Sequence, residues 1–264
     1  MRSLQRFAFV LAPVLALAAC GGGDDAADRL NLADPAVRFV HAAPSFGALT
    51  LYRDAEAAPD ATGADYKFAS DYFDVGMDSA HWSIGSADGR TTYGSVDIDP
   101  ARGEKYTLVA VQLAGPTVGT TLIRDPFNKP IGPSTARLRL MQAAFNTDKV
   151  DVYMNAPGTD IEQPGVDPLI AATAFNAAGP ASGEDAVAIP GGDYQLTITQ
   201  AGTKNVLFRG LASFDADRDV LLMTVPAPSM LHDCIRALIK LDKVAGATEI
   251  AATGVPYRAC MEPL

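Results

Sequence analysis

The sequence has few of the residues that most often build metal or nucleophilic sites. Its 264 residues include three cysteines and three histidines. His41, His81 and His232 lie in different parts of the chain, and none has a second ligand at a metal-binding spacing. The sequence also lacks a phosphate-binding P-loop, a G-x-S-x-G elbow and an H-E-x-x-H motif. We therefore expect no cofactor and no metal, and we expect the protein not to be an enzyme.

Positive charge is also scarce. The chain has 21 basic and 31 acidic residues, so its net charge is −10. Loss of an N-terminal signal peptide with Arg2 and Arg6 would leave 19 basic residues against 31 acidic ones, or −12. An acidic surface repels phosphate backbones and anionic headgroups, so we expect no nucleic-acid partner and no electrostatic attachment to a membrane.

The long apolar run of the chain lies at its N-terminus. After Arg2 and Arg6, residues 7–19 are almost entirely apolar. Roughly 13 residues span about 20 Å as a helix, which is too short for a hydrocarbon core of about 30 Å. The pattern predicts a signal peptide over residues 1–19.

The residues at the end of this run, Leu17-Ala18-Ala19-Cys20, resemble a bacterial lipobox. The resemblance implies cleavage before Cys20 and a lipid on its thiol, with residues 20–35 as a flexible tether that begins Gly21-Gly22-Gly23. By resemblance to lipoprotein sorting rules, glycine after the cysteine favours the outer membrane. The alternative is an ordinary secretory signal with an incidental cysteine.

Two further cysteines would meet an oxidising compartment outside the cytoplasm. We expect Cys234 and Cys260 to pair, because no C-x-x-C spacing favours a redox or metal role. The bridge would close a loop of roughly 27 residues and stabilise the fold by about 3 to 4 kcal/mol. It would fasten a C-terminal tail over residues 231–264.

An internal repeat divides the rest of the chain. Residues 37–54 align without gaps with residues 138–155 at an offset of 101, with Arg38 matching Arg139 and Tyr52 matching Tyr153. Residues 75–84 match residues 189–198 at an offset of 114. The difference, 114 − 101 = 13, means that the second copy has about 13 extra residues. We place them in a longer surface loop over residues 156–188, where function often resides.

Both copies show the alternation of apolar and polar residues that is typical of strands, with turn signals between them. The fold class predicted is all-β, with two tandem Ig-like or transthyretin-like β-sandwich modules over residues 36–130 and 136–230. The tail is ambiguous. Residues 235–241 fit a strand or a helical stripe, and we favour the strand.

Several motifs of both copies are familiar. Residues 38–44 (RFVHAAP) and 150–155 (VDVYMN) resemble opening motifs of the domain-of-unknown-function family numbered 4397, and residues 105–111 and 190–194 resemble its later strands. The resemblance covers roughly residues 36–225. It implies tandem extracytoplasmic β-sandwiches and no known reaction, so it transfers no site residue.

Some acidic and aromatic residues are candidates for binding. Residues 215–219 (DADRD) resemble the start of a calcium loop, but glycine and glutamate are missing later in it, which favours a solvated turn. Asp97, Asp99 and Glu104 are better interpreted as an acidic surface than as catalytic carboxylates. Trp82 could stack on a glycan, although packing within the sandwich is the preferred interpretation.

The sequence therefore predicts a non-catalytic module of the bacterial cell envelope, binding or structural in role and anchored through lipid on Cys20. Its loops would be presented to a protein or glycan partner. One alternative is a hydrolase of envelope polysaccharide or peptide, with carboxylates assembled between the two modules. Another is an adhesion module stabilised by calcium.

Overall fold

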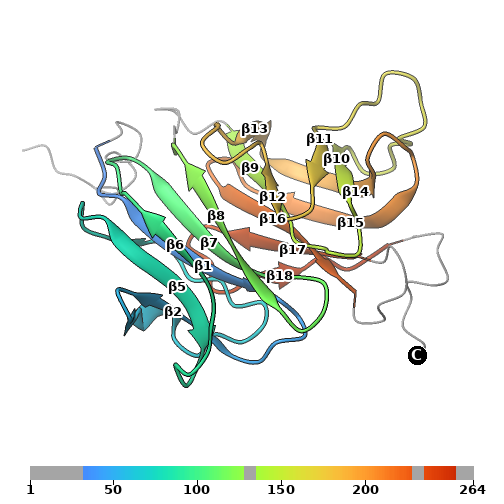
Figure 1. The fold of residues 1–264 in the computed structure, drawn as a ribbon. Coiled ribbons are helices and arrows are strands. Elements are labelled where there is room, and N and C mark those ends of the chain that lie inside the picture. The colour runs from blue at the N-terminus through green and yellow to red at the C-terminus, as the bar shows by residue number, and fades with distance from the viewer. Residues whose placement is uncertain (1–31, 128–134, 228–234, 254–264) are drawn as a thin grey trace, which may run out of the picture.

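The computed structural model describes residues 32–127, 135–227 and 235–253, and its strands form four sheets (Figure 1). The predicted all-β sandwich fold is confirmed. The signal peptide, Cys20, Cys234 and Cys260 lie outside the described residues, as does His232. Within the described residues, no helix has the length and apolar character needed to cross a bilayer.

The first module consists of two four-stranded sheets. The inner sheet has the order β4-β1-β7-β8 and the outer sheet the order β3-β2-β5-β6. β1 and β7 are parallel, whereas the other pairs are antiparallel. The elements are β1 (Ala36–Ala42), β2 (Leu49–Arg53), β3 (Glu56–Ala57), the 3-10 helix η1 (Pro59–Ala61), β4 (Phe73–Asp74), β5 (Ala80–Ser86), β6 (Thr92–Ile98), β7 (Lys105–Gln112) and β8 (Val118–Asp125).

The second module has the same two layers. Its outer sheet has the order β11-β10-β14-β15, and its inner sheet the order β12-β9-β16-β17-β18, with β13 also paired to β9. The strands are β9 (Thr135–Gln142), β10 (Lys149–Asn155), β11 (Ile170–Ala174), β12 (Ala177–Gly179), β13 (Val187–Pro190), β14 (Gly192–Gln200), β15 (Val206–Phe214), β16 (Asp219–Pro226), β17 (Ile235–Leu241) and β18 (Thr248–Glu249).

The C-terminal segment is part of the second sandwich. β17 pairs along the whole length of β16, and β18 pairs with β17. The preference for a strand over residues 235–241 is confirmed. The described part of the predicted tail thus continues the inner sheet, because the apolar side chains of β17 complete the core beside β16.

The two modules repeat one another in register. The parallel pair β1–β7 places Val37 opposite Tyr106, and the pair β9–β16 places Leu138 opposite Val220. Those partners are displaced by 101 and 114 residues, the offsets of the sequence repeat. A bulge between residues 84 and 85 recurs between residues 198 and 199. The alternation of side chains therefore specified the same pairing twice.

The extra residues of the second module lie in two places. An isolated β-bridge pairs Val40 with Ala69, and the equivalent backbone pair in the second module is Met141 with Ala178. The offset between Ala69 and Ala178 is therefore 109 residues. Eight residues (109 − 101) are therefore added before β11, and five (114 − 109) between β12 and β13. The prediction of one long loop over residues 156–188 is wrong, because β11, β12 and the start of β13 lie within it.

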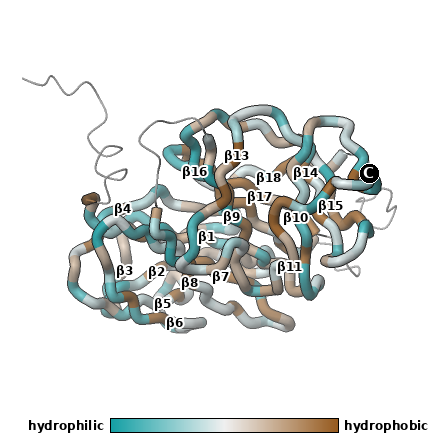
Figure 2. Tube along the Cα trace, turned by 90° about the horizontal axis from the view of Figure 1, so that it is seen from above, coloured by the Kyte–Doolittle hydropathy of each residue, from teal (hydrophilic) through white to brown (hydrophobic). Residues whose placement is uncertain are grey.

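The inner sheets of the two modules pack face to face, which gives four layers of sheet (Figure 1). Val40 and Val109 of the first module share an apolar cluster with their counterparts Met141 and Met223. The central strands of the inner sheets are consequently buried on both faces. In Figure 2, apolar segments gather around β9 and β17, between the outer layers.

Candidate functional site

A depression with a volume of about 620 Å³ opens at one end of the first sandwich. Residues of β2, β3, η1, β4 and β5 line it. Its size falls within the range of roughly 300 to 1,000 Å³ that is typical of ligand pockets. The turn between β2 and β3 forms part of the wall, and both of its residues have positive φ, 49° at Asp54 and 71° at Ala55. Such angles favour glycine or asparagine, so this turn stores backbone strain beside the depression.

Trp82 lines the depression but does not offer an exposed ring. It is only 1% exposed, and its ring is tilted against Phe73 with a centroid separation of 6.3 Å. The guanidinium of Arg53 lies 5.7 Å from the centroid of the indole. The indole N–H has no hydrogen-bond partner among the described residues. The packing interpretation of Trp82 is therefore correct, and stacking of a sugar on this ring is excluded in the present conformation.

The wall of the depression is strongly acidic. It contains one arginine and four carboxylates, which gives 1 − 4 = −3; these residues are Arg53, Asp54, Glu56, Asp60 and Asp74. Arg53 lies 4.0 Å from Asp54, whose carboxylate also accepts a hydrogen bond of 2.9 Å from the backbone N–H of His81. Several like charges around a concave surface attract cations and repel anions.

The second module does not repeat this chemistry. The repeat offsets place Leu196 at the position of Trp82 and Ala188 at the position of Asp74. The eight-residue insertion lies over the same outer sheet, where the side chain of Gln195 bonds to the backbone of Gly158 and Thr159. Two residues of the acidic depression thus have uncharged, aliphatic counterparts in the second module.

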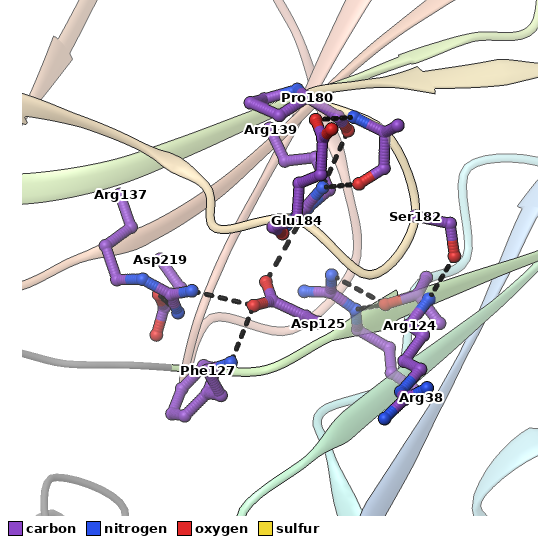
Figure 3. Close-up of polar contacts among 12 residues, drawn as sticks. Arg38, Arg124, Asp125, Phe127, Arg137, Arg139, Pro180, Ser182, Glu184 and Asp219 are labelled. Atoms are coloured by element: carbon purple, nitrogen blue, oxygen red, sulfur yellow. Dashed lines mark hydrogen bonds and ion pairs between the residues drawn. The ribbon is translucent and has the colours of Figure 1, made fainter.

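A second cluster of charged side chains is buried where the modules meet (Figure 3). Arg137 on β9 forms ion pairs of 2.7 Å with Asp125 and 2.9 Å with Asp219. Burial disfavours its charged form, but the charges and hydrogen bonds of the two carboxylates outweigh this and raise the pKa of Arg137. Arg137 therefore ties β8 of the first module to the inner sheet of the second.

Arg139 binds the five-residue insertion between β12 and β13. Its guanidinium donates to the carbonyl oxygens of Pro180 at 2.7 Å and Ala181 at 2.9 Å, and also to that of Glu184. The same insertion pairs with β8, because the N–H of Arg124 donates to the hydroxyl of Ser182 at 2.8 Å (Figure 3). The insertion thus covers part of an edge strand of the first module, which protects that edge from pairing elsewhere.

Arg38 completes the cluster from the first module. Its Nε and one terminal nitrogen donate to the hydroxyl of Thr107 at 3.2 and 3.0 Å, and its guanidinium lies 4.4 Å above the ring of Tyr72. The Tyr72 and Thr107 hydroxyls are 3.1 Å apart. A cavity of about 20 Å³ lies between these groups and the charged side chains of the second module. That volume accommodates about one water-sized group.

The structure keeps the two described histidines apart. His41 is buried, and it bonds to the carbonyl oxygen of Gly47 at 3.0 Å and to the N–H of Ala43 at 3.2 Å. The prediction that His41 makes structural hydrogen bonds near a strand end is confirmed. His81 is exposed on the outer sheet, 2.7 Å from Asp97.

The acidic candidates are also dispersed. Asp99 accepts a hydrogen bond from Ser79, whereas Glu104 binds Arg124 and Tyr106. In residues 215–219, Asp219 points to Arg137 instead of a shared ion. No group of three or more histidine, cysteine, aspartate or glutamate side chains that could hold a metal occurs within the described ranges.

Sequence reasoning missed both the acidic depression and the junction cluster. The depression assembles from three segments of the chain, around residues 53–60, 73–75 and 82, that no motif links. One feature of the sequence did point to the junction, because a charged arginine is conserved between the two copies, as Arg38 and Arg139, within strands that are mainly apolar. An arginine at an equivalent strand position in both copies indicates a buried partner, although the sequence does not say which.

Comparison with known proteins supports the family resemblance. Residues 35–153 match a family described as a domain of unknown function, DUF4397. No curated protein matches the chain. The match spans the whole first module, and it reaches into β10 of the second.

Solved structures give weak likenesses. One is a family 41 carbohydrate-binding module from streptococcal virulence factors, studied for alpha-glucan recognition, with 13% identity and a TM-score of 0.23 over 73% of this chain and 93% of that one. Another is a family CBM26 module from Eubacterium rectale, in complex with maltoheptaose, with 6% identity and a TM-score of 0.22 over 83% and 97%. TM-scores this low carry no inference about the ligand.

Proposed function

We propose that this protein, whose residues 35–153 match the DUF4397 family, is a non-catalytic binding protein of the bacterial cell envelope. Its ligand would occupy the acidic depression at the end of the first sandwich. The observation that carries the proposal is the coincidence of a volume of about 620 Å³, four carboxylates and a strained turn in the same place. The depression is formed largely by the β2–β3 turn and η1 at one end of the sandwich, and binding residues are often carried by such connecting segments on a rigid scaffold.

The charge of the depression favours a cationic ligand. With a net charge of −3 on its wall, a lysine-bearing segment of an envelope protein would gain both Coulomb attraction and charge-assisted hydrogen bonds. Glu56, Asp60 and Asp74 are exposed and therefore accessible to such a segment. A neutral glycan, which would bind through its hydroxyls, is the alternative ligand.

The cellular location of the protein is proposed from its sequence. The lipobox resemblance at residues 17–20 supports a lipid anchor on Cys20 and a location at the outer membrane. Replacement of Cys20 by serine should abolish acylation. The protein should then move from the detergent phase to the aqueous phase on phase partitioning of cell extracts.

A hydrolase with its site between the two modules finds no support at the junction. The carboxylates there, Asp125 and Asp219, both bind Arg137. The cavity beside them has a volume of only about 20 Å³, too small for a sugar or a peptide bond with its neighbours. Non-catalytic binding therefore remains the better proposal.

A binding experiment tests the depression directly. Glu56→Gln and Asp74→Asn, combined in one variant, remove two charges from side chains that make no described intramolecular hydrogen bond or ion pair. Calorimetric titration with a short oligolysine peptide should show a Kd about tenfold weaker than for the wild type, and the difference should shrink at high salt. A neutral oligosaccharide, titrated in parallel, tests the alternative ligand.

The matched control is Asp193→Asn, an exposed carboxylate on β14 of the second module. It changes the total charge without touching the depression. Equal loss of affinity in this control and in the double variant would mean that only overall charge matters, and the proposed site would be wrong. Binding of the oligosaccharide but not of the peptide would replace the cationic ligand by a glycan.

A further inference from the structure

The cavity at the module junction is lined by more positive than negative charge. Three guanidiniums and two carboxylates surround it, which gives 3 − 2 = +1; they belong to Arg38, Arg137, Arg139, Asp125 and Asp219. The arginines are 5%, 6% and 4% exposed. A buried charge without a counter-charge is costly because it has lost its hydration.

The contacts assign this excess charge to Arg38. Arg137 forms ion pairs with both carboxylates. Arg139 donates hydrogen bonds to three carbonyl oxygens and also lies 3.6 Å from the carboxylate of Asp125. No described carboxylate forms an ion pair with Arg38. Its partners are the Thr107 hydroxyl and the face of the Tyr72 ring. These are neutral groups, so they satisfy hydrogen bonds without cancelling the charge.

The positive charge of Arg38 also acts on a neighbouring lysine, Lys240. Lys240 on β17 is fully buried, and burial lowers its pKa, although its partner Asp71 at 2.7 Å opposes the shift. The positive charge of Arg38 also lowers the pKa of Lys240. Among the described contacts, the ion pair of Asp71 is with Lys240, not with Arg38.

The hydroxyl groups beside Arg38 leave one proton for an occupant of the cavity. Thr107 Oγ accepts two hydrogen bonds from Arg38, and it lies 3.1 Å from the Tyr72 hydroxyl. Only one of the two hydroxyl protons can lie between these oxygens. The other can be donated into the cavity, where a guanidinium and a hydroxyl together favour an acceptor with negative charge.

We propose that the junction cavity binds one monovalent anion of the size of chloride. The volume of about 20 Å³ accommodates a single monatomic ion and is too small for sulfate, phosphate or acetate. The anion offsets the charge of Arg38 and contacts groups of both modules. It therefore stabilises the packing of the modules, independently of any ligand in the acidic depression.

Bromide tests the site in a crystal. Bromide has nearly the radius of chloride and gives an anomalous signal, so crystals grown with bromide in place of chloride should show an anomalous peak within hydrogen-bond distance of the Arg38 guanidinium. Ordinary density for a water, without an anomalous peak there, would overturn the proposal. This measurement needs no variant, so it does not depend on the folding of a mutant protein.

Chloride dependence tests the site in solution. When gluconate is replaced by chloride at constant ionic strength, the Tm of the mature chain should rise by a few degrees, because an ion that binds only the folded state stabilises it by mass action. Arg38→Met should abolish this rise, and Arg90→Met, on an arginine that is 86% exposed, should retain it. A bromide peak without any chloride effect would indicate binding at crystal concentration only and would contradict the proposal. An unchanged chloride effect in Arg38→Met would also contradict it.

Discussion

His41 and Gln142 occupy the same position in the two modules, and each bonds to the N–H two residues later and to a carbonyl five or six residues later. His41 accepts from the N–H of Ala43 and bonds to the carbonyl of Gly47, while Gln142 accepts from the N–H of Ala144 at 2.8 Å and donates to the carbonyl of Thr147 at 2.9 Å. The side chain of His41 therefore holds the backbone that follows β1, and the side chain of Gln142 holds the backbone that follows β9. The imidazole must be neutral to do so, with its proton on Nε2.

This relationship predicts an effect of acid on stability. Burial lowers the pKa of His41, against opposing contributions from Gly47 and Asp65, whereas in the unfolded chain the pKa is about 6.5. The unfolded state thus binds more protons below that pH, and the contribution of His41 is lost as the pH falls from about 6.5 toward its folded pKa. His41→Gln should remove this loss in urea unfolding at a series of pH values, and at neutral pH should stay within about 1 kcal/mol of the wild type.

The control for this prediction is His81→Gln. His81 is exposed on the outer sheet, so its replacement should leave the acid-side loss of stability in place. A loss of the same size in His41→Gln as in the wild type would show that another group causes it.

The repeat made much of the fold predictable. The offsets of 101 and 114 carried over from the sequence to the strand register, and the role of His41 followed from its alignment with Gln142. Both conclusions rest on local patterns, since alternation fixes which face of a strand is buried. The position of the two insertions did not follow, because the short strands β11 and β12 lack a strong pattern.

The packing of one module on the other could not be read from the sequence. Val40 and Met141 alternate with residues that face the two cores, so on alternation alone they would face solvent. Their burial depends on another inner sheet, distant along the chain, with a complementary apolar face. The acidic depression could not be predicted for a related reason. Its residues come together only when β2, β3, η1, β4 and β5 are folded against one another.

Replacement of Arg137 by methionine should be strongly destabilising. Asp125 and Asp219 would be left buried at the junction without the guanidinium that both contact at less than 3 Å. Removing one member of a buried ion pair costs about 3 to 5 kcal/mol. Urea unfolding at neutral pH measures the loss, and a change below about 1 kcal/mol would show that the network is hydrated and weak.

Lys240→Met should behave differently, although Lys240 is also buried and ion-paired. Its partner Asp71 has a side chain that is 57% exposed and would regain solvent, and methionine keeps most of the apolar volume of the lysine stem. The cost should therefore stay within about 1 kcal/mol at neutral pH, offset by the release of a buried ammonium. A loss comparable to that of Arg137→Met in the same urea experiment would show that Asp71 is not solvated after the substitution.

The shared apolar cluster predicts that the two modules unfold together. Met223 is fully buried between the inner sheets, apart from the core of either sandwich. The wild type should therefore give one calorimetric transition, with equal calorimetric and van't Hoff enthalpies. Met223→Lys places an ammonium in the cluster, so it should lower the Tm by several degrees or split the transition in two.

Leu211→Lys on the exposed edge of β15, where leucine is 58% exposed, should leave the transition unchanged. Two transitions in the wild type would mean that each module is stable alone, and that the junction adds little to the stability of either.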